Sequence, residues 1–439
     1  MMENKLPVGW QCKRLDQIAD FLDGQRKPIK EGDRQSIQGE YPYYGASGII
    51  DYINDYLFDD ELILLGEDGA NIVNRSSPLA FRVSGKCWIN NHAHVIKPRV
   101  GTEIDFLVEY LESIDYSGLN SGTAQPKLNL ASCQSIPVLI PPVEEQKVIA
   151  AVFSTWDRGI RQLTDLIAAK VRFKQGLMQQ LLTGKRRLPQ PYHNNDTFDL
   201  VPESILSLGL SATAVEVERG LNAKSFDEGI PQLHQRPDGW KTIRFSDLLY
   251  PVQRPLSLKP DREYQLVTAK RYRAGIVPRE VLRGDQIKTT TQFEAKSGDF
   301  LISRRQIVHG ACGLVPQSLD GAVVSNEYSC LRAKEELDPL FLEYFTHTTY
   351  LQRTFYQASV GVTVEKMIFR LDEWMRYEIH LPPIDEQRRI VSLLSAIDRE
   401  IVLLDRQQKM LSVQKKGLMQ KLLTGQIRVP MNKEISLNE

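Results

Sequence analysis

One segment of the chain occurs twice, and this repeat constrains the architecture more than any other feature. Residues 141–189 return as residues 382–430 at a constant offset of 241, with 21 identities in 49 aligned positions. A shorter match opens each half, where residues 7–10 correspond to residues 237–240 at an offset of 230. The stretches between these matches, which we call the first and second body, differ in sequence. The chain is therefore a tandem duplication in which each half has an opening motif, a body of its own and the shared segment.

Each copy of the repeated segment is predicted to form one long helix. Prolines and acidic residues stand at its head, and Gly184 or Gly425, followed by Pro189 or Pro430, stands at its tail. Prolines and carboxylates favour the first turn of a helix, whereas glycine and a following proline favour its end. We therefore expect two helices of similar length, one after each body.

The two predicted helices carry matching heptad seams, in which apolar side chains recur at alternating steps of four and three. The expected interface residues are Ile149, Phe153, Trp156, Ile160 and Leu163 in the first helix and Ile390, Leu394, Ile397, Ile401 and Leu404 in the second. Gly176 and Gly417 recur at the same phase, which suggests a close approach of the helices, with a breathing helix end as the alternative. Since the second body is inserted between the helices, we expect an antiparallel coiled coil with approximate two-fold symmetry. The alternative is that each helix merely packs on its own domain.

The length of 439 residues also indicates several domains, because one core ordinarily takes about 100 to 200 residues. Short β-type runs at 61–65 and 298–302 favour α+β bodies with mainly antiparallel sheets. The predicted boundaries are 1–140 for a first globular domain, 141–184 for the first long helix, 185–236 for a linker with possible local helix, 237–381 for a second globular domain, 382–425 for the second long helix and 426–439 for a C-terminal tail.

Composition excludes several classes of protein. The chain is 42% hydrophobic and 25% charged, with no apolar run long enough to span a membrane and no apolar signal core near its start, so we expect a cytoplasmic protein. Its five cysteines are widely scattered and form no C-x-x-C pair, which supports neither a disulfide framework nor a zinc site.

Charge differs between the two bodies although the whole chain is neutral. Residues 239–380 carry 20 basic and 17 acidic residues, whereas residues 9–140 carry 12 and 18. A case for nucleic-acid binding must therefore come from local sequence. In the second body, cations, an aromatic residue and an amide suit phosphate anchoring and base readout, with a solvated face as the alternative. The expected contact residues there are Lys270, Arg271, Arg273, Arg304, Arg305 and Gln306.

The first body offers a weaker set of candidates in two turn-rich segments, with ordinary hairpin packing as the alternative. The expected DNA-contacting residues are Tyr43, Tyr44, Ser47, Asn90, Asn91 and His92. His92 and His94 could lie on one strand face as metal ligands, but no supporting ligand stands at a suitable spacing. We expect no metal.

Sequence motifs of catalysis are missing: there is no phosphate-binding P-loop, no dinucleotide-binding glycine motif and no methyl-transfer loop. Asp261, Glu294 and Lys296 superficially match a metal-dependent nuclease pattern. Patterns of three residues arise by chance, and the first half has no equivalent. No catalytic residue is predicted.

Taken together, these blocks resemble the specificity subunit of type I restriction-modification systems. The resemblance rests on the paired P-P-x-[DE]-E-Q and G-L-M-Q-x-L-L-T-G segments, with support from Y-Y-G-A-S-G at 43–48 and L-G-E-D-G-A-N at 65–71. It spans almost the whole chain. Two shared blocks at one offset, flanking divergent bodies, match that family's plan of two target-recognition domains and two conserved helical regions.

The resemblance implies a non-catalytic, DNA-binding subunit of a host-defence system. Each body would recognise one half of a bipartite double-stranded target, and the coiled coil would set the spacer between the halves. Two modification (methyltransferase) subunits with S-adenosylmethionine would methylate adenine. ATP-driven restriction subunits with Mg would cleave unmodified DNA, and this chain would hold no cofactor itself. The alternative from another class is a duplicated coiled-coil adaptor that binds protein partners without base-specific DNA contact; an enzyme in its own right is a third possibility.

Overall fold

The computed structural model describes residues 6–122, 125–188, 229–289 and 291–430. Two compact units can be distinguished: residues 1–161 with 409–439, and residues 162–408. Each unit therefore combines one body with part of both repeated segments. Residues 189–228, which form most of the predicted linker with possible local helix, lie outside the described residues.

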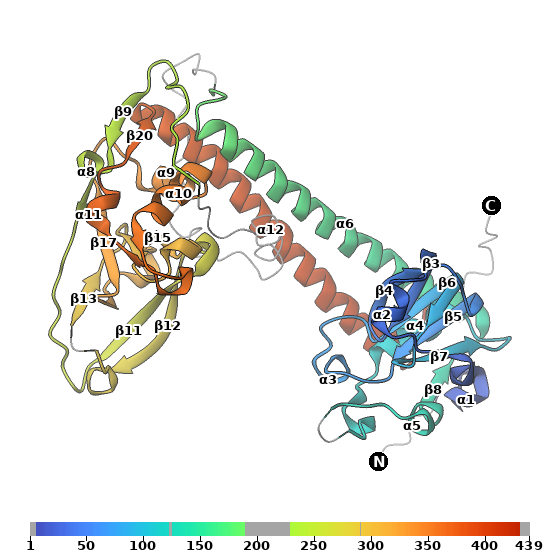
Figure 1. The fold of residues 1–439 in the computed structure, drawn as a ribbon. Coiled ribbons are helices and arrows are strands. Elements are labelled where there is room, and N and C mark those ends of the chain that lie inside the picture. Colours follow the sequence, from blue (N-terminus) through green and yellow to red (C-terminus); the bar gives the residue numbers. More distant parts are fainter. Residues whose placement is uncertain (1–5, 123–124, 189–228, 290, 431–439) are drawn as a thin grey trace. The chain divides into compact units, whose positions relative to one another are not determined.

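The first unit is built on a six-stranded sheet (Figure 1). Neighbouring strands are antiparallel except for β3 and β6, which pair in parallel. In spatial order the strands are β2 (Ala19–Phe21), β7 (Ala93–Pro98), β5 (Phe58–Gly66), β6 (Ala80–Ile89), β3 (Gln38–Gly45) and β4 (Gly48–Ile53). β1 (Gln11–Arg14) pairs separately with β8 (Pro137–Ile140). The predicted run at 61–65 lies within β5.

Helix α4 (Ile104–Ser113) is the longest helix that belongs to the first body alone. Its N-cap Glu103 accepts a hydrogen bond from the Phe106 amide, and Phe106, Leu107 and Leu111 are buried. The short helices are α1 (Leu15–Ile18), α2 (Glu31–Arg34), α3 (Asn71–Asn74) and α5 (Leu130–Gln134).

The second unit contains two four-stranded sheets with small strand pairs beside them. The first sheet is β10 (Leu249–Pro251), β17 (Tyr328–Ala333), β14 (Phe300–Ser303) and β15 (Cys312–Leu314). The second is β12 (Ile276–Arg283), β11 (Glu263–Ala269), β16 (Ala322–Ser325) and β13 (Gln292–Ala295). The two-stranded pairs are β18 (Ser359–Val360) with β19 (Ile368–Phe369), and β20 (Glu378–Leu381) with β9 (Lys241–Arg244). Its helices are α8 (Phe245–Leu248), α9 (Pro339–Phe345), α10 (Thr349–Gln357) and α11 (Leu371–Trp374).

Both bodies thus mix helices with mainly antiparallel sheets, as the sequence predicted. In the second unit the core is dominated by aromatic stacking around the fully buried Trp374, whose ring stacks on Phe245 at 4.2 Å and on Phe355 at 5.2 Å between centroids.

The two long helices are confirmed as α6 (Val143–Leu181) and α12 (Ile384–Leu422), each of 39 residues (Figure 1). In the first unit Phe153, near the start of α6, packs with Leu422, near the end of α12. In the second unit Val171, in the later half of α6, packs with Ile397, in the early half of α12. Both pairings require opposite directions, so the predicted antiparallel coiled coil is confirmed.

The predicted seam is not buried evenly. Ile149, Phe153, Ile390, Leu394, Ile397 and Ile401 are buried, whereas Trp156, Ile160, Leu163 and Leu404 are only partly buried. Phe153 also contacts the cluster that contains Trp10 and Phe106 of the first body. The helix ends therefore pack on a globular core as well as on each other.

The repeated glutamines explain how each long helix is attached to its body. Gln146 accepts a hydrogen bond from the Glu103 amide at 2.7 Å and donates to the Gly101 and Pro141 carbonyls. Gln387 does the same with the Asp338 amide at 2.9 Å and with the carbonyls of Glu336 and Pro382. Each side chain thereby links the start of a long helix to the start of a body helix, α4 or α9.

The preceding glutamates connect the start of one long helix to the segment that follows the other. Glu145, whose side chain is 1% exposed, accepts two hydrogen bonds from Arg428, at 2.6 and 3.0 Å, and one from the Trp10 indole at 3.1 Å. Glu386 is held by Arg187 in the same two-point manner, at 2.5 and 2.6 Å. The two glutamates are separated by the repeat offset of 241 residues, and so are the two arginines. Equivalent residues of the repeat therefore form the same contact in each unit.

Lysines join the helices at a second repeated position, which is buried for Lys174 and half-buried for Lys415. In the first unit Lys415 of α12 contacts Asp157 of α6 at 2.7 Å and Glu109 of α4 at 3.0 Å. In the second, Lys174 of α6 contacts Asp398 of α12 at 2.7 Å. Lys174 and Lys415, which are equivalent in the repeat, are therefore part of the interface between the helices.

The glycines inside the long helices do not serve the purpose that their recurrence suggested. A Cβ atom added at Gly176 or Gly417 would meet no atom within 4 Å, so the predicted close approach of the helices is wrong. The close approach occurs instead beyond the helix ends. Gly184 and Gly425 have φ of +67° and +70°, and an added Cβ would collide with Pro237 and Pro7 respectively.

These two kinds of glycine should respond in opposite directions to alanine. Gly417→Ala should raise the free energy of unfolding by up to about 1 kcal/mol, because alanine favours the helix and finds open space. Gly425→Ala should lower it by at least about 1 kcal/mol, because the left-handed backbone penalises a side chain and Pro7 blocks it. Thermal and urea unfolding of the full chain would measure both; equal effects of the two substitutions would contradict this account.

Glu145 and its neighbour Glu144 provide a second matched comparison. Glu145→Ala should destabilise the full chain by about 2 kcal/mol, because the substitution removes three hydrogen bonds to a buried carboxylate. Glu144, with a side chain 70% exposed, should tolerate alanine with little change. Urea unfolding monitored by circular dichroism would separate the two, and similar losses would show that Glu145 contributes only its charge near the helix start.

Candidate DNA interface

Three loops of the first unit meet where β5 ends. The loop after β5 begins at Glu67, whose amide donates to the carbonyl of His92, in the turn between β6 and β7, at 2.9 Å. The Glu67 carbonyl accepts from the Leu128 amide at 2.8 Å, and the Gly69 amide donates to the Pro126 carbonyl at 3.1 Å. Segments distant in sequence are thus joined by backbone hydrogen bonds, which do not depend on the side chains displayed.

The same arrangement occurs at the end of β14 in the second unit. The Arg304 amide donates to the carbonyl of Glu327, in the turn between β16 and β17, at 2.9 Å. The Arg304 carbonyl accepts from the Phe369 amide at 2.8 Å. Glu67, His92 and Leu128 therefore correspond to Arg304, Glu327 and Phe369. We call this shared set of hydrogen bonds the three-loop frame.

A buried ionic network supports the frame in the first unit. His94, 1% exposed, places Nδ1 at 2.6 Å from Asp23 Oδ2 and Nε2 at 3.1 Å from the Leu128 carbonyl oxygen. Both partners are acceptors, so both ring nitrogens must donate and the ring is an imidazolium. Burial opposes this charge, but hydrogen bonds to and charge interactions with Asp23 and Cys133 together outweigh burial and raise the pKa of His94 to about 10.

Asp23, Glu67 and His94 lie close enough to suggest a metal site, with one ligand atom of each within 4.8 Å of the others. Two cationic side chains already form ion pairs with this group: Arg26 contacts Glu67 at 2.8 Å, and Lys127 contacts Glu67 at 3.3 Å. Because His94 donates from both nitrogens, it has no lone pair for a metal. We assign the group to ion pairing.

The first-body candidates divide by exposure. Tyr43 is buried, and its hydroxyl accepts from the Ile29 amide at 3.0 Å, while the amide oxygen of buried Asn90 accepts from the His92 amide at 2.8 Å. These two side chains support the hairpins and do not face outward, because hydrogen bonding within the fold has buried them. Tyr44 is half-buried beside Phe81. The exposed members of the predicted set are Ser47, Asn91 and His92.

The second-body candidates lie on two loops near the frame. Lys270, Arg271, Arg304 and Arg305 are exposed, and Gln306 is half-buried. Arg273, also half-buried, has a φ of 58°, and its amide donates to the Gly310 carbonyl at 2.8 Å. Arg271 reaches Glu365 at 3.5 Å, in the loop that precedes β19. The cations predicted from 270–273 and 304–306 thus gather near one end of the second body.

Sequence reasoning missed Asp68 and Glu327, which stand on the same loops. Asp68 pairs with His92 at 2.8 Å, and Glu327 pairs with Arg305 at 2.6 Å. The turn sequences around 66–69 and 325–327 were visible, but which turn adjoins which depends on the sheet order.

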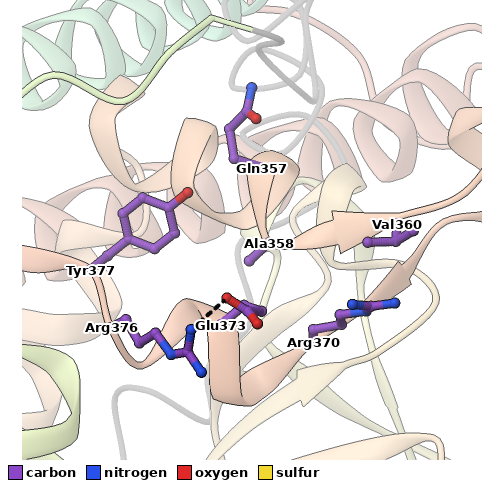
Figure 2. A pocket seen from close by; sticks show the side chains of 7 residues that line it. All are labelled: Gln357, Ala358, Val360, Arg370, Glu373, Arg376 and Tyr377. Carbon is purple, nitrogen blue, oxygen red and sulfur yellow. Dashed lines mark hydrogen bonds and ion pairs between the residues drawn. The ribbon is translucent and has the colours of Figure 1, made fainter.

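A surface pocket of about 410 Å³ lies beside the β18–β19 pair and α11 in the second unit (Figure 2). Arg376 reaches Glu373 at 3.3 Å, whereas Arg370 lies on the other side of the pocket (Figure 2). The lining holds a single carboxylate, that of Glu373, which is already paired with Arg376. Its residues are Gln357, Ala358, Val360, Arg370, Glu373, Arg376 and Tyr377.

Comparison with known proteins is decisive. The family model for the type I restriction modification DNA specificity domain matches twice, at residues 7–171 and 237–411. The chain belongs to this family. Each match begins at a Pro-x-Gly-Trp opening and runs through one body into one long helix, so the internal repeat is a repeat of specificity domains.

Relatives agree with this membership. The chain is 37% identical over 146 residues to a putative type I restriction enzyme specificity subunit of Haemophilus influenzae, a match that spans 33% of the chain and about a third (36%) of that relative's length. It is 22% identical over 455 residues to a type I restriction enzyme specificity subunit of Methanocaldococcus jannaschii, covering 97% of the chain and 94% of the relative.

Solved structures show the same fold. A type I restriction-modification S subunit from M. genitalium has a TM-score of 0.53 at 12% identity, covering 96% of this chain and 98% of that one. A chain from a structure of the type I R-M system has a TM-score of 0.52 at 17% identity, covering 96% and 100%. Among the described residues of the specificity subunit, no helix is both long and apolar enough to cross a membrane.

The imidazolium assignment of His94 predicts a particular pH dependence. A histidine whose pKa is raised in the folded state contributes stability fully below its unfolded pKa of about 6.5, and this contribution declines as the pH rises through about 10. His94→Gln should therefore lower the melting temperature most near pH 6 and progressively less up to pH 10.5. His92→Gln, which removes an exposed ring two residues away, is the control. A His94→Gln effect that is constant with pH would mean a neutral ring.

Proposed function

We propose that each specificity domain reads one half of a bipartite double-stranded DNA target and that the antiparallel helices set the spacer between the halves. The observation that carries this proposal is the three-loop frame, which is the same in both units but displays different side chains. A fixed frame with variable side chains is what two different half-sites require. The duplicated adaptor without base contact is less favoured, because both halves of the chain match a DNA specificity domain.

We further propose that catalysis belongs to partners. Two modification subunits would supply adenine methylation with S-adenosylmethionine, and restriction subunits would supply ATP- and Mg-dependent cleavage, as part of cytoplasmic host defence. This chain would need no cofactor. The pairing of the one carboxylate in the surface pocket, and the ion-paired state of the Asp23 group, support a role in recognition rather than in chemistry.

The negative charge of the first body suggests that this chain and its partners make different kinds of contact with DNA. Counterion release by Lys and Arg supplies much of the affinity of proteins for DNA. The first body has 12 basic against 18 acidic residues, so it would bind DNA weakly by itself. We infer that the modification subunits provide most phosphate contacts, while the specificity domains contact base edges.

Long-read mapping of methyladenine tests the proposal in cells that carry the cognate modification subunit, with and without this chain. We expect methylation only with the chain, at one split motif with a fixed spacer. Arg304→Ala should relax one half of that motif and leave the other intact. Methylation that is identical without the chain, with both proteins expressed and soluble, would contradict the role in specificity; equal relaxation of both halves would contradict one domain per half-site.

A further inference from the structure

Each three-loop frame displays a hydrogen-bonded pair of an acidic and a basic side chain, and the two pairs have opposite polarity. In the first unit Asp68 follows the end of β5 and contacts Nδ1 of His92 at 2.8 Å. In the second unit Arg305 occupies the position of Asp68, and Glu327 occupies the position of His92, with Nε to Oε2 at 2.6 Å and Nη2 to Oε1 at 3.3 Å. The acidic and basic partners have thus exchanged places on the same backbone frame.

The correspondence between the two pairs rests on backbone geometry and not on sequence similarity. In each unit the residue before Asp68 or Arg305 donates its amide to the carbonyl of His92 or Glu327. The turn is also closed in the same way. The Asn90 side-chain oxygen accepts from the amide of His92 at 2.8 Å, and the Ser325 hydroxyl accepts from the amide of Glu327 at 3.4 Å.

The fold does not need these pairs. The side chains of His92, Arg305 and Glu327 are exposed, at 51%, 61% and 45%, whereas that of Asp68 is half-buried, at 24%. Exposed ion pairs contribute little to stability, and the backbone hydrogen bonds already hold the loops together. Two pairs at corresponding positions with reversed signs are therefore better explained by what they present to solvent than by what they stabilise.

The chemistry presented differs between the units. Glu327 holds Arg305 along its Nε–Nη2 edge, which leaves the terminal edge of the guanidinium, with Nη1, pointing away from the carboxylate. Paired N–H donors on such an edge match the O6 and N7 acceptors of guanine in the major groove. Glu327 would then act as a positioning residue, fixing the plane in which Arg305 presents its donors.

In the first unit the pair presents acceptors. A carboxylate only accepts, so Nδ1 of His92 carries the proton that faces Asp68. Asp68 itself has further lone pairs. Acceptors suit the exocyclic amino groups of adenine and cytosine, which are the major-groove donors.

We propose that the Asp68–His92 and Arg305–Glu327 pairs are the specificity-determining elements of the two domains: Arg305 reads a guanine in one half-site, and Asp68 with His92 reads an adenine or cytosine in the other. This inference rests on the proposed function, since it assumes that the three-loop frames face DNA. It adds Asp68 and Glu327 to the residues that determine the target.

Methylation mapping of variants in cells with the cognate modification subunit tests the inference. Arg305→Gln should raise methylation at sites with one substituted base pair in one half by roughly 10- to 100-fold relative to the parent, because one bidentate contact is lost. Glu327→Gln, which removes the charge that orients Arg305, should relax the same base pair by a smaller factor. Asp68→Asn and His92→Gln should relax one position in the other half.

Exposed pairs away from the frames provide matched controls. Asp285→Asn disrupts the Arg283–Asp285 pair of the second unit, and Asp20→Asn disrupts the Arg99–Asp20 pair of the first; neither should alter the motif. Soluble yield and melting temperature of every variant should match those of the parent chain, which separates lost readout from lost folding.

The outcomes are distinguishable. If the parent chain directs methylation to a split motif and the four frame variants leave that motif unchanged, the paired-reader inference fails while the proposed function stands. Uniformly weaker methylation at all sites would make Arg305 a phosphate contact and would also overturn the inference. If the parent chain directs no methylation, the proposed function fails, and the inference fails with it.

Discussion

The structure depends on reciprocal ties between the start of one long helix and the segment that follows the other. Glu145 holds Arg428, and Glu386 holds Arg187, so each unit is closed by residues from distant parts of the sequence. A carboxylate buried at a helix start is favourable only where its charge is paired and its oxygens are hydrogen-bonded. The repeat supplies both partners twice, which explains why the helical segments stay alike while the bodies diverge.

This division leaves the bodies free to change what they display. In each unit the end of a central strand, a hairpin turn and the segment after a polar loop are joined by backbone hydrogen bonds, from Glu67 to His92 and from Arg304 to Glu327. Backbone groups are common to all residues, so side chains at the frame can vary without a loss of these bonds. The positions of Asp68 and His92 in the first unit are occupied by Arg305 and Glu327 in the second, which illustrates this freedom.

The sequence predicted the long helices and their antiparallel pairing, because heptad spacing and the order of segments are visible without coordinates. The predicted role of Gly176 and Gly417 was wrong, because recurrence at one phase does not reveal whether an atom lies opposite. Burial of Tyr43 and Asn90, and the pairing of Glu327 with Arg305, could not be predicted, since both depend on which strands are neighbours. The predicted DNA-contacting residues lie on loops near the frames, and their contact with DNA stays a prediction.

The ionic network beneath the frame of the first unit reflects the acidic charge of that body. The acidic first body holds a buried imidazolium, His94, under its frame, where Asp23 stabilises the charge. This cation offsets part of the negative charge of Asp23 and Glu67 directly beneath the loops, as Arg26 and Lys127 do. Without that compensation, like charges would repel both one another and an approaching phosphate backbone. In the acidic first domain, cations therefore compensate the carboxylates that lie beneath the loops.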